Sequence, residues 1–252
     1  MVSAVLGKKL SKPESIFVSD IDGARRQYLE QKYGVTVAGS SRLVAEKGDI
    51  VVLCIKPQNL VEVMAEIGGK LRPAQLVLSI IAGKNIGTVT SGLNHSRVVR
   101  AMPNTPAQIG MGVTVWTATP EVSQQQKKQA ASILGAMGKE VYVDDEKYID
   151  MATAVSGSGP AYFFLMVESL VEAAVNIGLS PDVANELVLQ TMLGAAHLIQ
   201  KSGKPPAELR QIVTSRGGTT ESALSQLQEG GFAELLTRAV NAAYKRAREL
   251  GQ

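Results

Sequence analysis

The stretch IVTSRGGTTESAL, residues 212–224, gathers residue types that can bind an anion through the main chain. Gly217 and Gly218 carry no side chain, so a ligand can approach the backbone closely there. Thr219 or Thr220 can cap a following helix, and the free N–H groups of a first helical turn attract negative charge. A carboxylate fits such a cradle. A plain capped turn uses the same residue types, and from these residues alone that alternative stays open.

This loop lies in a half of the chain that is helix-like throughout. Strand signals stop after about residue 146, and helical segments separated by Gly and Pro follow at 146–155, 160–177, 181–202, 206–214, 220–229 and 232–250. Several of them are apolar or small on almost every side, as in LVLQTMLGAAHLI. A lone helical domain of this size has too little interior to hide such faces, so we expect them to pack against a partner subunit.

The first half alternates short β-rich runs with helical stretches. The runs are SIFVSD, VTVAG, DIVVLCIKP, QLVLSIIAG, SRVVRAMPN, GVTVWTA and EVYVDD. Strands that are apolar on both faces and separated by helices indicate βαβ units around a parallel sheet. We therefore predict an α/β Rossmann-like dinucleotide-binding domain over 1–145 and an all-α domain for substrate binding and dimerisation over 146–252.

A Rossmann-like sheet binds its dinucleotide on a glycine-rich loop after the first strand. The chain instead opens with the helix-like MVSAVLGKKL, and SIFVSD then has the pattern of the second strand. We expect a start that lacks roughly 15 to 20 residues, the length of one strand and a glycine loop. The two strands beside the missing one are then expected to have unpaired edges. The alternative is that SIFVSD is the first strand of a different fold.

The composition is that of a globular protein and argues against several classes of function. The 26 basic and 23 acidic residues are scattered, without the Lys/Arg stripe of a nucleic-acid surface.

Cys54 is the only cysteine, which excludes an internal disulfide and fits a reducing cytoplasm. We interpret it as a small buried thiol in a strand. The most membrane-like window, 161–179, carries Glu168 and Glu172 on one face, so we expect a buried helix of a soluble cytoplasmic protein without a signal peptide.

The two histidines are too far apart in the sequence pattern for a metal pair or a catalytic triad. His95 lies in a predicted turn and His197 in an apolar helix, so we expect a surface and a core role respectively. No metal is predicted.

The whole chain resembles the pyrroline-5-carboxylate reductase family, from near its first helix to its C-terminus. The segment VTSRGGTTESALSQLQEGGF is similar to the family's signature, and CIKPQ, IIAG, RAMPNTP and SGSGPAYFF match its other blocks in the right order. The resemblance implies NAD(P)H-dependent reduction of 1-pyrroline-5-carboxylate to L-proline, the last step of proline biosynthesis. It also implies a Rossmann-like cofactor domain and an intertwined helical dimer domain, with homodimers that can assemble into a larger ring.

For the substrate, the resemblance implies that the loop at 217–219 holds the carboxylate of pyrroline-5-carboxylate or proline. Thr220 occupies the position whose hydroxyl lies near the ring nitrogen. Hydride addition is easier on the iminium, so Thr220, or a water held by it and Ser215, is the candidate hydrogen-bonding group for the catalytic step. Glu146 matches a family position near the substrate, where a carboxylate favours the cationic ring; an ordinary acid at a helix start is the alternative.

For the cofactor, the resemblance points to strand ends and to the RAMPNTP loop. The residues are Ser19, Ser41, Cys54, Ile55, Lys56, Pro57, Ile80, Ile81, Ala82, Met102, Pro103 and Asn104. Simple packing, a rigid loop or a solvated strand end is the alternative role for several of them. Asp20 can bind ribose hydroxyls as in NAD sites. Ser19, Arg25 and Arg26 can instead meet a 2′-phosphate. The resemblance favours NADPH, the cofactor that the family commonly uses, with NADH possible.

The chain departs from the family's pattern at three places. Ser41 stands where members often carry Asn, Arg216 replaces a frequent proline, and the glycine loop is missing. Two alternatives to the predicted pyrroline-5-carboxylate reductase function therefore stay open. One is a reductase for another cyclic imino acid, because the signature loop reads mainly the carboxylate. The other is a truncated non-catalytic subunit that dimerises or binds proline.

Overall fold

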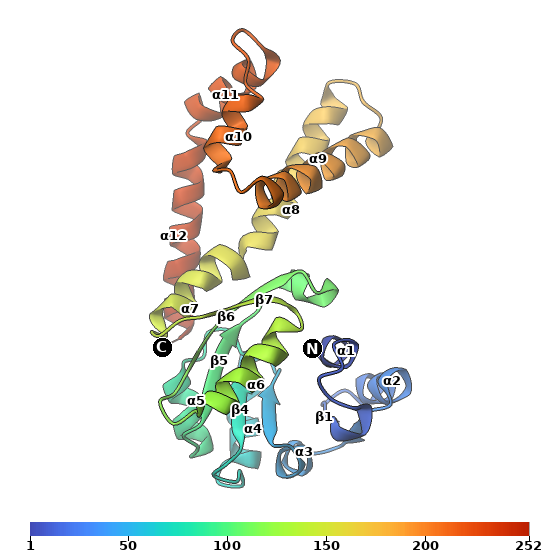
Figure 1. Cartoon of the computed structure of the whole chain (residues 1–252), viewed down its shortest axis with the longest axis vertical. Coiled ribbons are helices and arrows are strands. Elements are labelled where there is room, and N and C mark those ends of the chain that lie inside the picture. Colours follow the sequence, from blue (N-terminus) through green and yellow to red (C-terminus); the bar gives the residue numbers. More distant parts are fainter. Residues whose placement is uncertain (252) are drawn as a thin grey trace. The chain divides into compact units, whose positions relative to one another are not determined.

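The fold is described from a computed structural model, which describes residues 1–251 and separates into two compact units (Figure 1). The first unit comprises Met1–Ser158 together with the residues from Ala243 onward, and the second comprises Gly159–Ala242. Each unit is described by itself. The predicted functional domains 1–145 and 146–252 stay a prediction.

The first unit contains a mostly parallel sheet in two pieces. Strands β1 (Phe17–Ser19) and β2 (Thr36–Ala38) pair with each other. The second piece has the order β3 (Ile50–Leu53), β4 (Leu76–Ser79), β5 (Val98–Met102), β6 (Gly112–Ala118) and β7 (Gly138–Tyr142), and only the β5–β6 pair is antiparallel. This confirms the Rossmann-like class. Within residues 1–251, β1 and β3 belong to separate sheets, which is where the sequence predicts unpaired edges.

Helices connect these strands, and several begin where the sequence supplies a cap. They are α1 (Val2–Gly7), α2 (Gly23–Tyr33), α3 (Ser41–Lys47), α4 (Leu60–Ile67), α5 (Ile86–Leu93), α6 (Gln124–Gly135) and α7 (Lys147–Ala152). Side chains of Asp22, Ser40, Asn85 and Ser123 cap α2, α3, α5 and α6, each accepting a hydrogen bond from an N–H of the first turn. Short 3₁₀ turns lie at Pro13–Ser15, Pro57–Asn59 and Thr105–Ile109, and a π-helical turn at Thr153–Gly157 follows α7.

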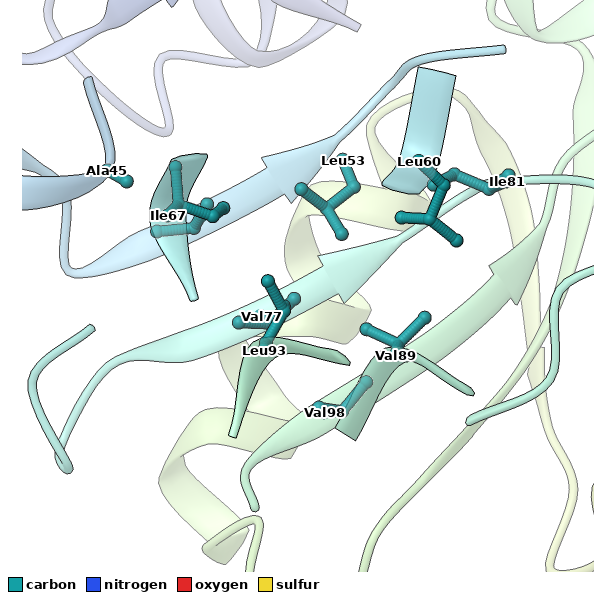
Figure 2. Close-up of a cluster of buried hydrophobic side chains, with 10 residues drawn as sticks. Ala45, Leu53, Leu60, Ile67, Val77, Ile81, Val89, Leu93 and Val98 are labelled. Atoms are coloured by element: carbon teal, nitrogen blue, oxygen red, sulfur yellow. The ribbon is translucent and has the colours of Figure 1, made fainter. Parts of the chain in front are cut away.

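Both faces of the five-stranded sheet are covered by apolar side chains. Val77 of β4 packs in one core cluster with residues of α4 and α5, and Figure 2 shows these helices lying over the strands. Its neighbours Leu76 and Leu78 pack in a second cluster with Trp116 and with residues of α6. Successive residues of a strand point to opposite faces, so a strand buried on both sides needs a continuous apolar run, as the sequence has.

The remaining helices are α8 (Gly159–Asn176), α9 (Pro181–Ser202), α10 (Pro206–Ile212), α11 (Thr219–Glu229) and α12 (Phe232–Leu250). This confirms the predicted helical half. Within the described chain most large apolar side chains of α8 and α9 are exposed, Phe163, Phe164 and Leu165 among them. The helix at 161–179 is therefore not buried within one chain, contrary to the prediction, because α9 packs against α8 and still leaves these side chains uncovered.

Within residues 1–251 one helical stretch, Lys147–Asn176, is long and apolar enough to cross a membrane by length and composition. Core helices of water-soluble proteins meet the same criterion, so it is a weak indication of a membrane span. The stretch carries Glu168 and Glu172 on exposed positions.

Candidate active site

The signature loop of the second unit lies between α10 and α11. Gly217 has a φ of 72°, a left-handed conformation that favours glycine, and its N–H donates to Glu221 Oε2 at 2.6 Å. Gly218 is the N-cap residue of α11, with Thr219 in the first helical position. The cap expected from Thr219 or Thr220 is therefore absent: the helix begins one residue too early, and no side chain caps it. Its first N–H groups are thus available to an external acceptor.

The loop folds back on Ser215. The Gly218 N–H donates to the Ser215 carbonyl oxygen at 3.0 Å, and a Cβ placed on Gly218 would lie 2.5 Å from Ser215 Oγ. A side chain at this position would push the Ser215 hydroxyl out of its present place against the backbone. The structure thus brings Ser215 and both glycines together with the start of α11. Thr220 is half-buried in the first turn of that helix.

A shallow hollow of about 310 Å³ lies between α10 and α11. Its lining includes Arg210, Thr214 and Glu221, but neither the two glycines nor Thr220. It is therefore adjacent to the signature loop and does not coincide with the cradle described above.

In the first unit, Glu146 precedes α7 and its carboxylate is already engaged. Its Oε1 accepts a hydrogen bond from the Ile86 N–H at 2.7 Å and lies 2.7 Å from Arg100 Nη1. Arg100 Nη2 lies 2.8 Å from Asp150 Oδ1, and the Arg100 side chain is only 4% exposed. A buried guanidinium therefore joins two carboxylates and links β5 to α7. The role of Glu146 at the substrate stays a prediction.

Sequence reasoning did not identify Arg100 as important. The available signal was an arginine inside the apolar run VVRAM, because a charged side chain in a buried strand requires partners. The two carboxylates lie 46 and 50 residues further along, so the pairing itself could not be read from the sequence.

The predicted cofactor residues after β3 lie at the carboxyl edge of the sheet. Cys54 follows β3 directly and the residue is exposed, so the buried strand thiol expected there is wrong: the strand ends one residue earlier. Desolvation of the sulfur nevertheless raises the pKa of the Cys54 thiol. Ile55 packs against the first core cluster, while Lys56 and Pro57 are exposed at the start of a 3₁₀ turn.

The residues after β4 and β5 lie beside them, because β3, β4 and β5 are neighbours in the sheet. Ile81 is buried in the first core cluster and Ile80 packs against the second, which leaves Ala82 as the exposed member of this group. Met102 ends β5, and a Cβ on Gly157 would lie 3.2 Å from its Cε.

Beyond β5, the side chain of Asn104 has a clear structural partner. Its Oδ1 accepts a hydrogen bond from the Val113 N–H at 2.9 Å, which holds the start of β6. Pro103 lies between Met102 and Asn104 and is half-buried.

At the end of β1, Ser19 and Ser41 come together with their hydroxyl oxygens 3.4 Å apart. The Asp20 carboxylate accepts a hydrogen bond from the Asp22 N–H at 2.9 Å, and the Arg26 guanidinium donates to the Asp20 carbonyl oxygen. Arg25 lies over the ring of Tyr28, 5.1 Å from its centroid. The groups proposed for ribose or phosphate recognition thus cluster around one strand end.

Glu66 of α4 reaches the neighbouring helix start, a contact that sequence reasoning missed. Its Oε1 accepts hydrogen bonds from the Ser40 hydroxyl at 2.7 Å and from the Arg42 N–H at 3.1 Å. These hydrogen bonds, the one from Ser40 above all, hold the pKa of Glu66 below its ordinary value.

The histidine expectations are reversed in the single chain. His95 is buried, with Nε2 2.8 Å from the Gln75 carbonyl oxygen, whereas His197 is exposed on α9. The turn that contains His95 packs against the sheet, whereas His197 lies on a part of α9 that the rest of residues 1–251 leaves exposed. Among residues 1–251 no group of three or more His, Cys, Asp and Glu side chains is placed to hold a metal ion.

The strand ends fit part of a nicotinamide dinucleotide. Ala82 is a small exposed residue at a strand end that a flat ring can approach, and the Ser19 and Ser41 hydroxyls suit a ribose. In a complete sheet of this type, a first strand lies between β1 and β3, and the glycine-rich loop after it cradles the pyrophosphate. Within residues 1–251 neither that strand nor that loop is present.

Comparisons with known proteins agree with this arrangement. The family model described as "Pyrroline-5-carboxylate reductase dimerisation" matches residues 146–250, and "NADP oxidoreductase coenzyme F420-dependent" matches residues 1–83. A protein of Synechocystis sp. named pyrroline-5-carboxylate reductase is 40% identical over 253 residues, covering 100% of this chain and 94% of the relative.

Two solved structures extend the likeness to the fold. The structure of a pyrroline-5-carboxylate reductase from Coxiella burnetii has a TM-score of 0.93 and 37% identity, covering 100% of this chain and 93% of that one. The Plasmodium falciparum pyrroline carboxylate reductase with NADP bound has a TM-score of 0.86 and 29% identity, with the same coverage of 100% and 93%. This chain belongs to the pyrroline-5-carboxylate reductase family.

Proposed function

We propose that the chain reduces 1-pyrroline-5-carboxylate to L-proline with a nicotinamide cofactor, NADPH being preferred and NADH possible. The observation that carries the proposal is the uncapped N-terminus of α11 behind Gly217 and Gly218, inside the segment that matches the reductase family model. The NADP-oxidoreductase match over residues 1–83 and the NADP in the Plasmodium falciparum structure support the choice of cofactor.

In this proposal the signature loop binds the substrate through its backbone. The carboxylate accepts hydrogen bonds from N–H groups at the start of α11, where the helix dipole also favours negative charge. The Thr220 hydroxyl, or a water held between it and Ser215, hydrogen-bonds the protonated ring nitrogen. The cofactor supplies a hydride to the C=N carbon, so the side chains need only orient the substrate and favour its iminium form.

The test is the loss of NADPH absorbance on addition of pyrroline-5-carboxylate, compared between wild type and Thr220→Val. Valine keeps the shape and removes the hydroxyl, so kcat is expected to fall about 100-fold, at the lower end of what a positioned proton-transfer group contributes. Thr220→Ser keeps the hydroxyl and is expected to retain most of the activity.

The matched control is Thr237→Val on α12, whose hydroxyl donates to the Ala233 carbonyl oxygen of its own helix at 2.9 Å. It is expected to match wild type. Equal kcat values for the wild type and Thr220→Val would remove Thr220 from the chemistry, and a wild type that reduces other cyclic imino acids better would change the substrate assignment.

The assembly belongs to the same proposal. The exposed apolar residues of α8 and α9, together with the dimerisation family model over 146–250, support a homodimer in which these helices bury one another. This also explains the apolar stretch Lys147–Asn176 as an interface helix of a cytoplasmic protein.

A second candidate is a non-catalytic subunit that dimerises or binds proline. The family model over residues 146–250 is described by dimerisation alone, and that part of the chain contains the signature loop. Proline binding without NADPH binding, measured by calorimetry, would support this candidate. Binding of both ligands would exclude it.

A further inference from the structure

The loop after β4 is attached to the C-terminal end of the chain through Asn85. The Asn85 Oδ1 caps α5 by accepting hydrogen bonds from the Thr88 N–H at 2.7 Å and the Thr88 hydroxyl at 2.9 Å. Its Nδ2 donates to the Gly251 carbonyl oxygen at 3.0 Å. One half of the amide therefore holds the helix start, and the other half holds a residue 166 positions away.

A second contact joins the same two segments two residues earlier. A Cβ placed on Gly83 would lie 2.8 Å from Leu250 Cβ and 3.2 Å from the Leu250 carbonyl oxygen. Gly83 also has a positive φ, so the loop needs glycine both for its conformation and for the close approach of α12. The end of α12 therefore packs directly on the bare backbone of the loop.

A further restraint on the loop comes from the ion pair between Glu146 and the buried Arg100. The Ile86 N–H, the first of α5, donates to Glu146 Oε1, and that carboxylate is fixed by Arg100. The segment from Gly83 to Ile86 is thus restrained by its own helix cap, by Glu146 and by the C-terminal turn. Of these three restraints the C-terminal turn is the one contributed by the solvent-exposed end of a helix.

We propose that the turn at Leu250–Gly251 is a positioning clamp for the loop after β4, and that it fixes Ala82 for the flat ring of the nicotinamide. The positional role rests on the proposed function, because that function places the cofactor at this edge of the sheet. The clamp itself rests on the Asn85 and Gly83 contacts alone.

The experiment compares wild type with Asn85→Asp and with a chain that lacks residues 250–252. Aspartate keeps the oxygen that caps α5 and removes the donor to Gly251, so the helix start survives while the clamp is lost. Hydrogen exchange of the amides at 82–88 is measured in the protein without ligand. Losing one hydrogen bond of ordinary net strength is expected to speed exchange about 5-fold in both variants.

The functional readouts are the Kd for NADPH and, determined separately, kcat and the KM for each of the two substrates. A loosened loop is expected to raise the Kd and the KM for NADPH about 5-fold, with the KM for pyrroline-5-carboxylate unchanged, because the proposed function places the cofactor, and not the substrate, at this loop. The matched control is Glu249→Gln, which removes an ion pair with Arg246 at the same helix end and does not touch the loop.

Unchanged exchange at 82–88 in both variants would overturn the clamp. Faster exchange with unaltered NADPH affinity would overturn its positioning role. If the wild type binds no NADPH, the proposed function is contradicted instead. Hydrogen exchange at 82–88, which is measured without ligand, still tests whether the C-terminal turn restrains the loop.

Discussion

At the scale of single residues, Arg100 is a buried charge of the first unit that is held by two partners. It lies in a strand whose other residues are apolar, and its guanidinium is satisfied by Glu146 and Asp150. Removing the cation leaves two carboxylates close together, partly shielded from water. Glu146 must therefore first be considered as a structural partner, and any contact with substrate would be additional to that role.

Arg100→Met is expected to lower the free energy of unfolding by about 2 kcal/mol, below the range for a fully buried pair because both carboxylates remain partly exposed. Urea unfolding measures the loss. The control is Arg42→Met, which breaks an exposed i,i+4 pair with Glu46 and is expected to cost less than about 0.5 kcal/mol. Equal effects of the two substitutions would show that burial adds nothing to the Arg100 pairs.

At the scale of elements, helix starts explain much of the local structure. Asp22, Ser40, Asn85 and Ser123 are the residue types that cap helices, and each does so. The start of α11 is different, because Gly218 provides no side-chain oxygen and leaves the first turn open. The start of α3 is different again, because Glu66 of another helix adds a carboxylate to the Ser40 cap.

The Glu66 contact predicts a pH-dependent part of the stability. The folded-state pKa lies below the unfolded value of about 4.3, so the contribution is fully present above that value and is lost as the pH falls through the folded pKa. Glu66→Gln is expected to cost about 0.5–1 kcal/mol at neutral pH and to flatten the decline in stability below about pH 4.5.

Unfolding by urea between pH 3 and pH 7 measures this dependence. Glu62→Gln is the control, since Glu62 lies on the same helix, is exposed and has no described hydrogen bond among residues 1–251. If the free energy of unfolding falls as steeply with decreasing pH in Glu66→Gln as in Glu62→Gln, the pKa shift of Glu66 cannot be assigned to its hydrogen bonds at the start of α3.

At the scale of the whole molecule, the distribution of burial differs between the two halves. Strands β3, β4 and β5 have cores on both faces, whereas α8 contains only Gly159 and α9 only Ala184 as buried residues. Such extensive exposed apolar surface is rare on a stable monomer. A second copy of the chain is the occupant that the dimerisation family model supports.

Phe164→Asp on α8 is expected to weaken the dimer strongly. Each dimer loses two buried rings, about 3–6 kcal/mol, which is about a 10²- to 10⁴-fold rise in the dissociation constant. Light scattering after size-exclusion chromatography over a dilution series measures it. Val61→Asp on α4 of the first unit, an exposed apolar position of similar accessibility, is expected to leave the assembly unchanged.

The sequence by itself determined the alternation of strands and helices, the helical second half and the glycine loop before α11. These depend on period, turn residues and caps, which act over a few neighbouring positions. Tertiary structure alone decided that Arg100 joins Glu146 and Asp150, that His95 is buried while His197 is exposed, and that Asn85 holds Gly251. The physical reason is that these partners are brought together by the path of the folded chain, and no local pattern records which distant residue will fill a hydrogen bond or cover an apolar face.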